Sequence, residues 1–152
     1  MEEKSRILSS EFNRIEFISA DLEDIPSWTS LLEKAGFEPS IPTLMVLEGI
    51  TYYLTKPTLA SIFEWARSRH MTIIGEFGLP PEVVIPEHRE YPKRVFEVIT
   101  KLSHHPGANF YSREEFLDMA IQAGYSKISL IPMRDMQVLR TGGTYPFAKE
   151  NA

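Results

Sequence analysis

The feature that most constrains this chain is a short apolar run that ends in an acid and a glycine. Residues 44–47 read Leu-Met-Val-Leu, the pattern of a strand that is covered on both faces of a sheet. Glu48 and Gly49 follow, so a carboxylate and a residue with an unrestricted backbone stand at the carboxyl end of this strand. Ligands of open α/β sheets bind at that end. Glu48 is therefore a candidate binding residue; the alternative is that it caps the next helix.

Strand and helix patterns alternate around this run. Strand patterns over residues 14–20 and 71–77 lie before and after it, and two helices with apolar stripes separate the three strands. Ser27 and Thr55 are the expected N-caps of these helices, and Gly36 is the expected stop of the first. The alternation predicts an α/β fold with a mostly parallel sheet.

In the second half of the chain the alternation of strands and helices stops. Residues 78–92 are rich in proline and predict an irregular loop of the kind that often binds ligands. A helix is predicted over 93–103, and a capping box that begins at Ser112 predicts another. Residues 126–133 and 136–141 read as two strands of an antiparallel hairpin.

Length and composition narrow the class of protein. The 152 residues fit a single domain, 1–152. A net charge of −5 argues against a dedicated nucleic-acid surface. The absence of cysteine excludes disulfides and thiolate zinc sites, and no apolar run is long enough to span a membrane. We expect a cytoplasmic protein that binds neither nucleic acid nor membrane.

The histidines do not predict a metal site. His104 and His105 are adjacent in a loop, with His88 upstream, and neighbouring loop residues rarely converge on one ion. No ordered set of carboxylates accompanies them. A histidine that ends a helix, as His70 also does, more simply contacts the terminal carbonyls.

The segment from Phe17 to Pro57, FISADLEDIPSWTSLLEKAGFEPSIPTLMVLEGITYYLTKP, resembles the leucine carboxyl methyltransferase family. The matching features are Asp-Leu after a strand, a Trp-containing helix that ends in Gly-Phe, then Pro-Thr, a buried strand, Glu-Gly and a Tyr-Leu-Thr helix start. FYSREEFLDMAIQAGY follows in the family's order, so the resemblance covers about residues 5–141. This family includes bacterial and archaeal O-methyltransferases related to the tetracenomycin polyketide carboxyl methyltransferase.

The resemblance implies an S-adenosylmethionine-dependent enzyme with the Rossmann-like class I methyltransferase sheet and helices on both of its faces. By its motifs, Asp21 accepts a hydrogen bond from the adenine amino group and Leu22 donates one through its backbone N–H. Glu48 and Gly49 flank the methionyl part of the cofactor, where a carboxylate near the positive sulfonium is electrostatically favourable. These four residues are the cofactor-binding candidates.

The candidates for substrate binding have two origins. The resemblance implies that Tyr52 and Tyr53 face the methyl-transfer site or pack beneath it. The residue types alone suggest Arg89, Lys93 and Arg94, which flank the proline-rich loop and suit an acidic substrate, with a solvated helix face as the alternative. No catalytic residue is assigned, because a carboxylate acceptor needs no strong base.

The sequence lacks the glycine-rich loop by which the family holds its cofactor. A weak helical pattern over 3–12 resembles the helix between the family's second and third strands, so we expect a C-terminal part without the first two strands. Residues 44–47 then become an exposed apolar edge. The strand at 14–20 slides in beside them, or the edge pairs with a second copy, or a separate N-terminal polypeptide covers it. We expect a homodimer or a missing N-terminal chain.

Two functions follow from these features. The first is an S-adenosylmethionine-dependent O-methyltransferase that acts on a carboxyl or hydroxyl of a small molecule, such as a polyketide-like acid, and is incomplete without an N-terminal cofactor-binding part. The alternative is a catalytically inactive, truncated subunit or interaction module that pairs through its exposed sheet edge.

Overall fold

The structure of the chain is a computed structural model. It describes residues 15–83, 86, 89–103, 107–132, 135, 136 and 142. The helix predicted over 3–12 lies outside these residues, as do His88, His104 and His105.

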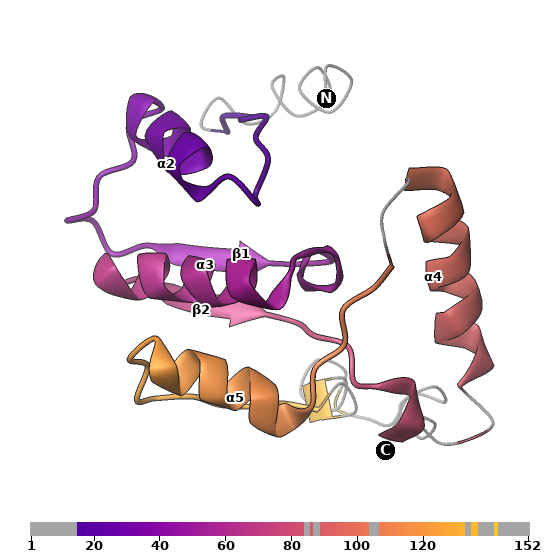
Figure 1. Cartoon of the computed structure of the whole chain (residues 1–152). Helices are drawn as coiled ribbons and strands as arrows, with labels where there is room; N and C mark the ends of the chain where they lie inside the picture. Colours follow the sequence, from indigo (N-terminus) through magenta and orange to yellow (C-terminus); the bar gives the residue numbers. More distant parts are fainter. Residues whose placement is uncertain are drawn as a thin grey trace.

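The centre of the fold is a parallel pair of strands joined by a helix. β1 (Leu44–Leu47) and β2 (Thr72–Gly75) pair in register along their whole length, and α3 (Lys56–Ser68) connects them. This βαβ unit confirms the strand predicted at 44–47 and places the next strand within the predicted 71–77 (Figure 1). Both strands therefore run in the same direction and end at the same edge of the sheet.

Local sequence signals explain α3. The Thr55 side chain caps the helix, accepting a hydrogen bond from the Thr58 backbone N–H at 3.3 Å, as predicted. The apolar side chains at helical spacing all face inward and are buried, which confirms the predicted stripe: Leu59, Ile62, Phe63 and Ala66.

The preceding helix, α2 (Ile25–Lys34), begins earlier than predicted. Its N-cap is Asp24, whose Oδ1 accepts from the Ser27 backbone N–H at 3.1 Å. Ser27 is therefore a donor in the first turn, and its assignment as the cap is wrong. Gly36 adopts a φ of 91° just beyond the helix, the left-handed conformation expected of a helix stop.

The last of the packed helices, α5 (Arg113–Gln122), carries the predicted capping box. The Ser112 Oγ accepts from the Glu115 N–H at 3.1 Å, and a Glu115 carboxylate oxygen accepts from the Ser112 N–H at 2.8 Å. Phe116 then stacks on Phe77, the ring centroids being 4.1 Å apart. This contact fixes α5 against the segment that follows β2.

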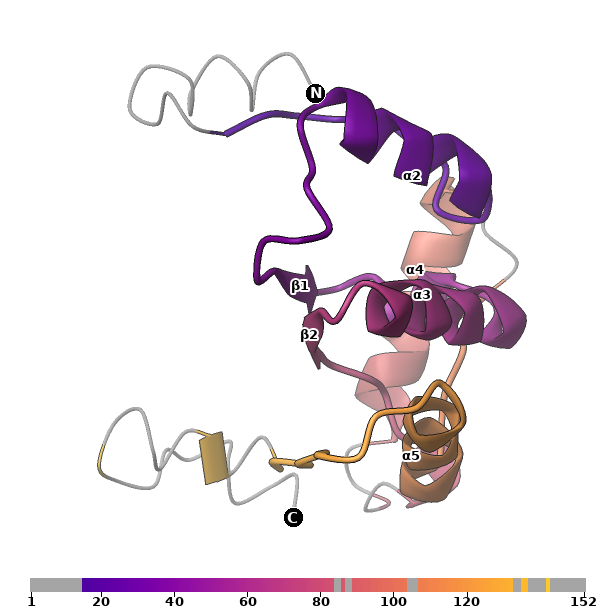
Figure 2. The ribbon, with the colours of Figure 1, turned by 90° about the vertical axis from the view of Figure 1, so that its left-hand side faces the viewer.

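The core lies on one side of the sheet only. Figure 2 shows α2, α3 and α5 on that side, with no described helix on the other. Leu44, Val46 and Ile74 face the uncovered side and are 52%, 56% and 56% exposed. The predictions of a strand buried on both faces and of helices on both faces are therefore wrong for the described residues. The buried cluster on the covered side consists of Trp28, Leu47, Leu54, Leu59, Ile62, Phe63, Tyr111 and Ala120.

Two predicted strands are not formed. Residues 15–20 run beyond β1 and residues 126–131 beyond β2, and neither segment joins a ladder in the described part of the chain (Figure 2). The first segment thus does not slide in beside β1. The predicted hairpin is not confirmed. The Met136 N–H donates to the Pro132 carbonyl at 3.1 Å in a helical turn, and residues 133, 134 and 137–141 lie outside the described part. A strand pattern needs the backbone of a neighbour, and neither segment has one here.

The remaining helix stands apart from the packed layer. α4 (Glu90–Ser103) follows the short 3₁₀ turn η2 (Pro81–Val83) and begins three residues before the predicted 93–103. The closely packed element pairs in the described structure are β1 with β2, α3 with β2, α3 with α5, and α2 with α3. α4 belongs to none of them, and Figure 1 shows it at the end of the molecule away from α2.

We predict that Ser112→Ala lowers the free energy of unfolding by about 1 kcal/mol, because the α5 N-terminus loses its side-chain cap. Urea denaturation followed by circular dichroism measures the change. Ser129→Ala, at an exposed position outside the helices, is the matched control and should leave the midpoint unchanged. Equal effects of both substitutions would contradict the prediction.

Glu115 should also make stability depend on pH. The hydrogen bond from Lys56, whose Nζ lies 2.6 Å from Oε1, lowers the pKa of Glu115, and the bond from the Ser112 N–H lowers it further. A lowered folded-state pKa contributes stability above the unfolded-state pKa, and this is lost as pH falls through the folded-state value. Glu115→Gln should therefore reduce stability at neutral pH, with a difference that shrinks in acid. A constant difference across a denaturation series in pH would rule this out.

Candidate functional site

The carboxyl ends of the two strands bring two acids to one place. Glu48 follows β1 and Glu76 follows β2, at neighbouring positions of the same sheet edge. The Gly49 N–H donates to Glu76 Oε1 at 2.7 Å, and Thr51 Oγ1 donates to the Glu76 carbonyl at 2.6 Å. We call this region, residues 21–23, 48–55 and 76–78, the carboxyl edge. Glu76 holds its central turn in place.

The turn after β1 leaves the Glu48 carboxylate without a hydrogen-bond partner among the described residues. Gly49 has a φ of 65°, and a Cβ built there would meet nothing within 4 Å, so the backbone turns beside open space. Glu48 is exposed and makes no hydrogen bond with another described residue. Ile50 and Thr55 are the N-caps of the next two helices, η1 (Thr51–Tyr53) and α3. The alternative that Glu48 is a helix cap is therefore wrong.

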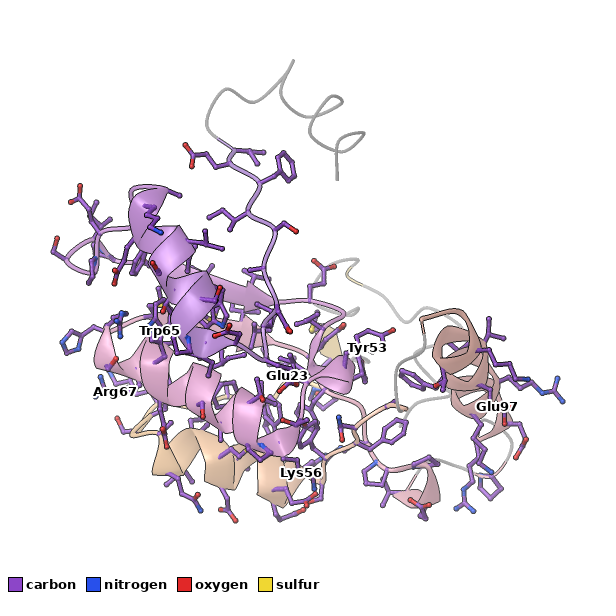
Figure 3. The ribbon with its side chains drawn as sticks, turned by 45° about the horizontal axis from the view of Figure 1, so that its top comes forward. Glu23, Tyr53, Lys56, Trp65, Arg67 and Glu97 are labelled. Atoms are coloured by element: carbon purple, nitrogen blue, oxygen red, sulfur yellow. The ribbon has the colours of Figure 1, made fainter. Side chains whose placement is uncertain are left out.

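Asp21 and Leu22 lie in a turn that is fastened to the start of α3. Asp21 Oδ1 accepts from the Glu23 N–H at 3.0 Å, and Leu22 packs on the core. The Glu23 carboxylate accepts from the Thr55 N–H at 3.0 Å and from the hydroxyls of Thr55 and Thr58 (Figure 3). The structure thus brings the Asp21–Leu22 turn to the carboxyl edge.

Sequence reasoning missed the two acids that organise this edge. Glu76 follows a strand, as Glu48 does, and the same positional argument would have found it. Glu23 follows Asp21 by two residues but gives no local sign of its partners, which lie 32 and 35 positions further along the chain.

Tyr52 belongs to this edge and packs on α4. Its ring packs on Phe96 with centroids 5.4 Å apart, and a Cβ at Gly78 would lie 2.7 Å from a Tyr52 ring carbon. Burial, and then the negative charge of Glu76, raises the pKa of the Tyr52 phenol above its ordinary value. Tyr52 is therefore a neutral hydrogen-bond donor at physiological pH.

The irregular segment around Asn109 holds Tyr52 and the neighbouring turn in place. The Asn109 N–H donates to the Tyr52 carbonyl at 2.7 Å, and Asn109 Nδ2 donates to the Leu54 carbonyl at 2.8 Å. The Tyr111 N–H donates to the Gly78 carbonyl at 2.9 Å, with the Tyr111 side chain fully buried. The segment around Asn109 therefore fixes η1 against the chain that leaves β2.

The basic residues are divided between three environments. Arg89 donates to the Glu82 carbonyl at 2.8 Å within the loop, Lys93 pairs with Glu90 at 3.0 Å, and Arg94 is exposed. Of these, Lys93 lines an open hollow of about 370 Å³ between α4 and the segment before α5. The other hollow-lining residues include Pro81, Phe96, Thr100, Lys101 and Phe110.

Across the described ranges, no three His, Asp or Glu side chains are grouped to hold a metal ion. His70 ends α3 with a φ of 56°, and its Nδ1 lies 3.5 Å from an Arg67 guanidinium nitrogen. None of the described helices is both long enough and apolar enough to cross a membrane.

We predict that Glu76→Gln lowers the pKa of Tyr52, because the charge that opposes the phenolate is removed while an oxygen remains for the Gly49 N–H. Burial is the larger cause of the shift, so the pKa should stay above 10.0. Nuclear magnetic resonance titration of the Tyr52 ring measures it. Glu64→Gln, at an exposed position of α3, is the control. An unchanged Tyr52 pKa in Glu76→Gln would contradict the proposed interaction.

Comparison with known proteins gives one family match, over the first part of the chain. The sequence model of the leucine carboxyl methyltransferases matches residues 1–67, which include Asp21, Leu22, Glu48 and Gly49. Neither the curated proteins nor the solved structures gave a match. Over residues 1–67, the chain is therefore similar to the leucine carboxyl methyltransferase family that its motifs predicted, and this similarity indicates a methyltransferase.

Proposed function

We propose that the carboxyl edge forms part of the site of an S-adenosylmethionine-dependent O-methyltransferase. Its acceptor is a small molecule with a carboxyl or hydroxyl group, such as a polyketide-like acid. The observation that carries this proposal is the anchoring of the Asp21–Leu22 turn by Glu23, which joins it to the same edge as Glu48 and Gly49. All five residues lie within the family match.

The residues at this edge fit two contacts of the cofactor. The Leu22 N–H donates to no other described residue, which leaves it available for an adenine acceptor. The exposed Glu48 carboxylate and the open space at Gly49 suit the positively charged methionyl end. The cofactor supplies an activated methyl group when it is bound.

Other contacts of the cofactor have no counterpart in residues 1–152. These residues hold no glycine-rich loop, so we propose that the remaining cofactor contacts and the first two strands of a Rossmann-like sheet come from outside them. The chain would then contribute the adenine and methionyl contacts and the floor of the acceptor site.

The chain's own groups orient the acceptor under this proposal. An acceptor carboxylate is already ionised at neutral pH, so no base is required. The neutral Tyr52 phenol donates a hydrogen bond to it, and Glu76 keeps the Gly49 backbone in place. Alignment of the reacting atoms is then the main contribution of the protein.

One observation favours the second candidate function, an interaction module without catalysis. The side chains of Leu44, Val46 and Ile74 are more than half exposed on one face of the sheet. Such a surface suits association with another polypeptide whether or not the carboxyl edge binds cofactor.

Calorimetric titration with S-adenosylmethionine and with its uncharged thioether product, S-adenosylhomocysteine, tests the enzymatic proposal. We expect Asp21→Asn to weaken both ligands by about tenfold, the effect of losing one hydrogen bond to a charged group. Glu48→Gln should weaken S-adenosylmethionine more, because only that ligand carries the sulfonium charge. Glu33→Gln, at an exposed position of α2, is the control. No binding at millimolar ligand would show that this chain alone is not a working enzyme.

A further inference from the structure

The open hollow beside α4 has no ligand under the proposed function. It lies between this helix and the segment that leads from it to α5 (Figure 1). Its volume of about 370 Å³ falls within the range of about 300–1,000 Å³ that is usual for small-molecule pockets. The hollow therefore has room for one small molecule, and its lining determines which kind.

One wall of the hollow is aromatic. Phe96 on α4 and Phe110 before α5 meet edge to face, with ring centroids 5.4 Å apart and ring planes at 89°. Pro81 and Ala108 extend this apolar surface. Both phenyl rings are only half-buried by the protein, so each keeps surface on which a ligand can pack. Flat aromatic groups pack well on such rings, edge to face or offset.

One face of α4 adds charge to this wall. Its residues at positions i, i+3, i+4, i+7 and i+8 all line the hollow, because this spacing places them on one side of a helix. They are Lys93, Phe96, Glu97, Thr100 and Lys101. The helix thus presents two ammonium groups, one carboxylate and one hydroxyl beside the aromatic wall.

The two lysines are available to a ligand. Lys93 pairs with Glu90 at 3.0 Å on the exposed surface, and an exposed pair of this kind is weak. Lys101 forms no ion pair with another described residue, and Glu97, one turn from each lysine, pairs with neither. Two cations thus outnumber one anion around the hollow, in a chain whose net charge is −5. This concentration of positive charge favours an anionic ligand.

We propose that the hollow binds a small aromatic acid, with its ring system against Phe96 and Phe110 and its carboxylate beside Lys93 and Lys101. A phosphate ion would leave the aromatic wall uncovered, and a neutral aromatic molecule would leave the ammonium groups without a partner. The proposal does not rest on methyl transfer, because it uses neither the cofactor-binding candidates nor the Tyr52 phenol.

Titration of the chain with 2-naphthoate and with its neutral amide, 2-naphthamide, tests this assignment. The two probes share one ring system and differ in charge. Calorimetry should show that 2-naphthoate binds at least about tenfold more tightly, the effect of a hydrogen bond to a charged group. Nuclear magnetic resonance should detect the bound probe at the rings of Phe96 and Phe110.

Substitutions in the charged lining should act with opposite signs. Lys101→Gln should weaken 2-naphthoate about tenfold, because one ammonium group is lost. Glu97→Gln should strengthen it, because a charge that repels the carboxylate is removed. Both variants should bind 2-naphthamide as before. Lys34→Gln, at an exposed position of α2, makes the same change in net charge as Lys101→Gln away from the hollow and is the matched control.

Ala108→Trp fills the hollow and should abolish binding of both probes, with circular dichroism to confirm that the variant folds. Three results would overturn the proposal. The first is no binding of 2-naphthoate at millimolar concentration. The second is equal affinity for the two probes, which would mean that the lysines do not recognise the carboxylate. The third is unchanged binding of 2-naphthoate by Ala108→Trp, which would place the acid elsewhere.

Titration of the same variants with S-adenosylmethionine separates these results from failure of the proposed function. The substitutions in the hollow leave Asp21 and Glu48 intact, so they should not change the affinity for the cofactor. Loss of 2-naphthoate binding with cofactor binding retained would concern the hollow alone.

Discussion

The parallel pairing of β1 and β2 is the constraint on which the rest of this structure depends. Parallel strands cannot be joined by a tight turn, so the connection is a helix, α3, that packs on one face. The same pairing brings both carboxyl ends to one edge, where Glu76 holds the Gly49 amide. This arrangement creates the candidate site, and the described part of the chain covers the sheet on the α3 side only.

The parts of the fold that were predictable are those with local causes. A hydroxyl or carboxylate within one turn of a helix start suffices to cap it, so Thr55 and the Ser112–Glu115 box could be identified without tertiary contacts. The buried stripe of α3 follows from helical spacing in the same way. The wrong N-cap at the start of α2 also has a local cause. Asp24 and Ser27 are both residue types that cap helices, and only the path of the backbone decides between them.

The parts that were not predictable depend on partners distant in the sequence. Residues 15–20 alternate like a strand, but alternation does not supply a neighbouring backbone, and the segment pairs with no strand among the described residues. The continuous apolar run of β1 predicted that both faces of the sheet are covered. Such a run makes burial of both faces favourable, but it does not supply the element that would cover the second face. At the site, the sequence predicted that Glu48 lies at the carboxyl end of β1. Its contact with the cofactor is a proposal. Glu23 could not be found because its bonds span more than thirty residues.

The candidate site is connected to α4 through an aromatic contact. Phe96 on this helix packs on Tyr52, whose carbonyl and ring are fixed beside the carboxyl edge, whereas Val95 and Val98 are exposed. Phe96 also lines the hollow between α4 and the segment before α5, so one side chain of this helix contacts both Tyr52 and the hollow. A displacement of α4 would therefore change the packing of Tyr52 and the shape of the hollow together.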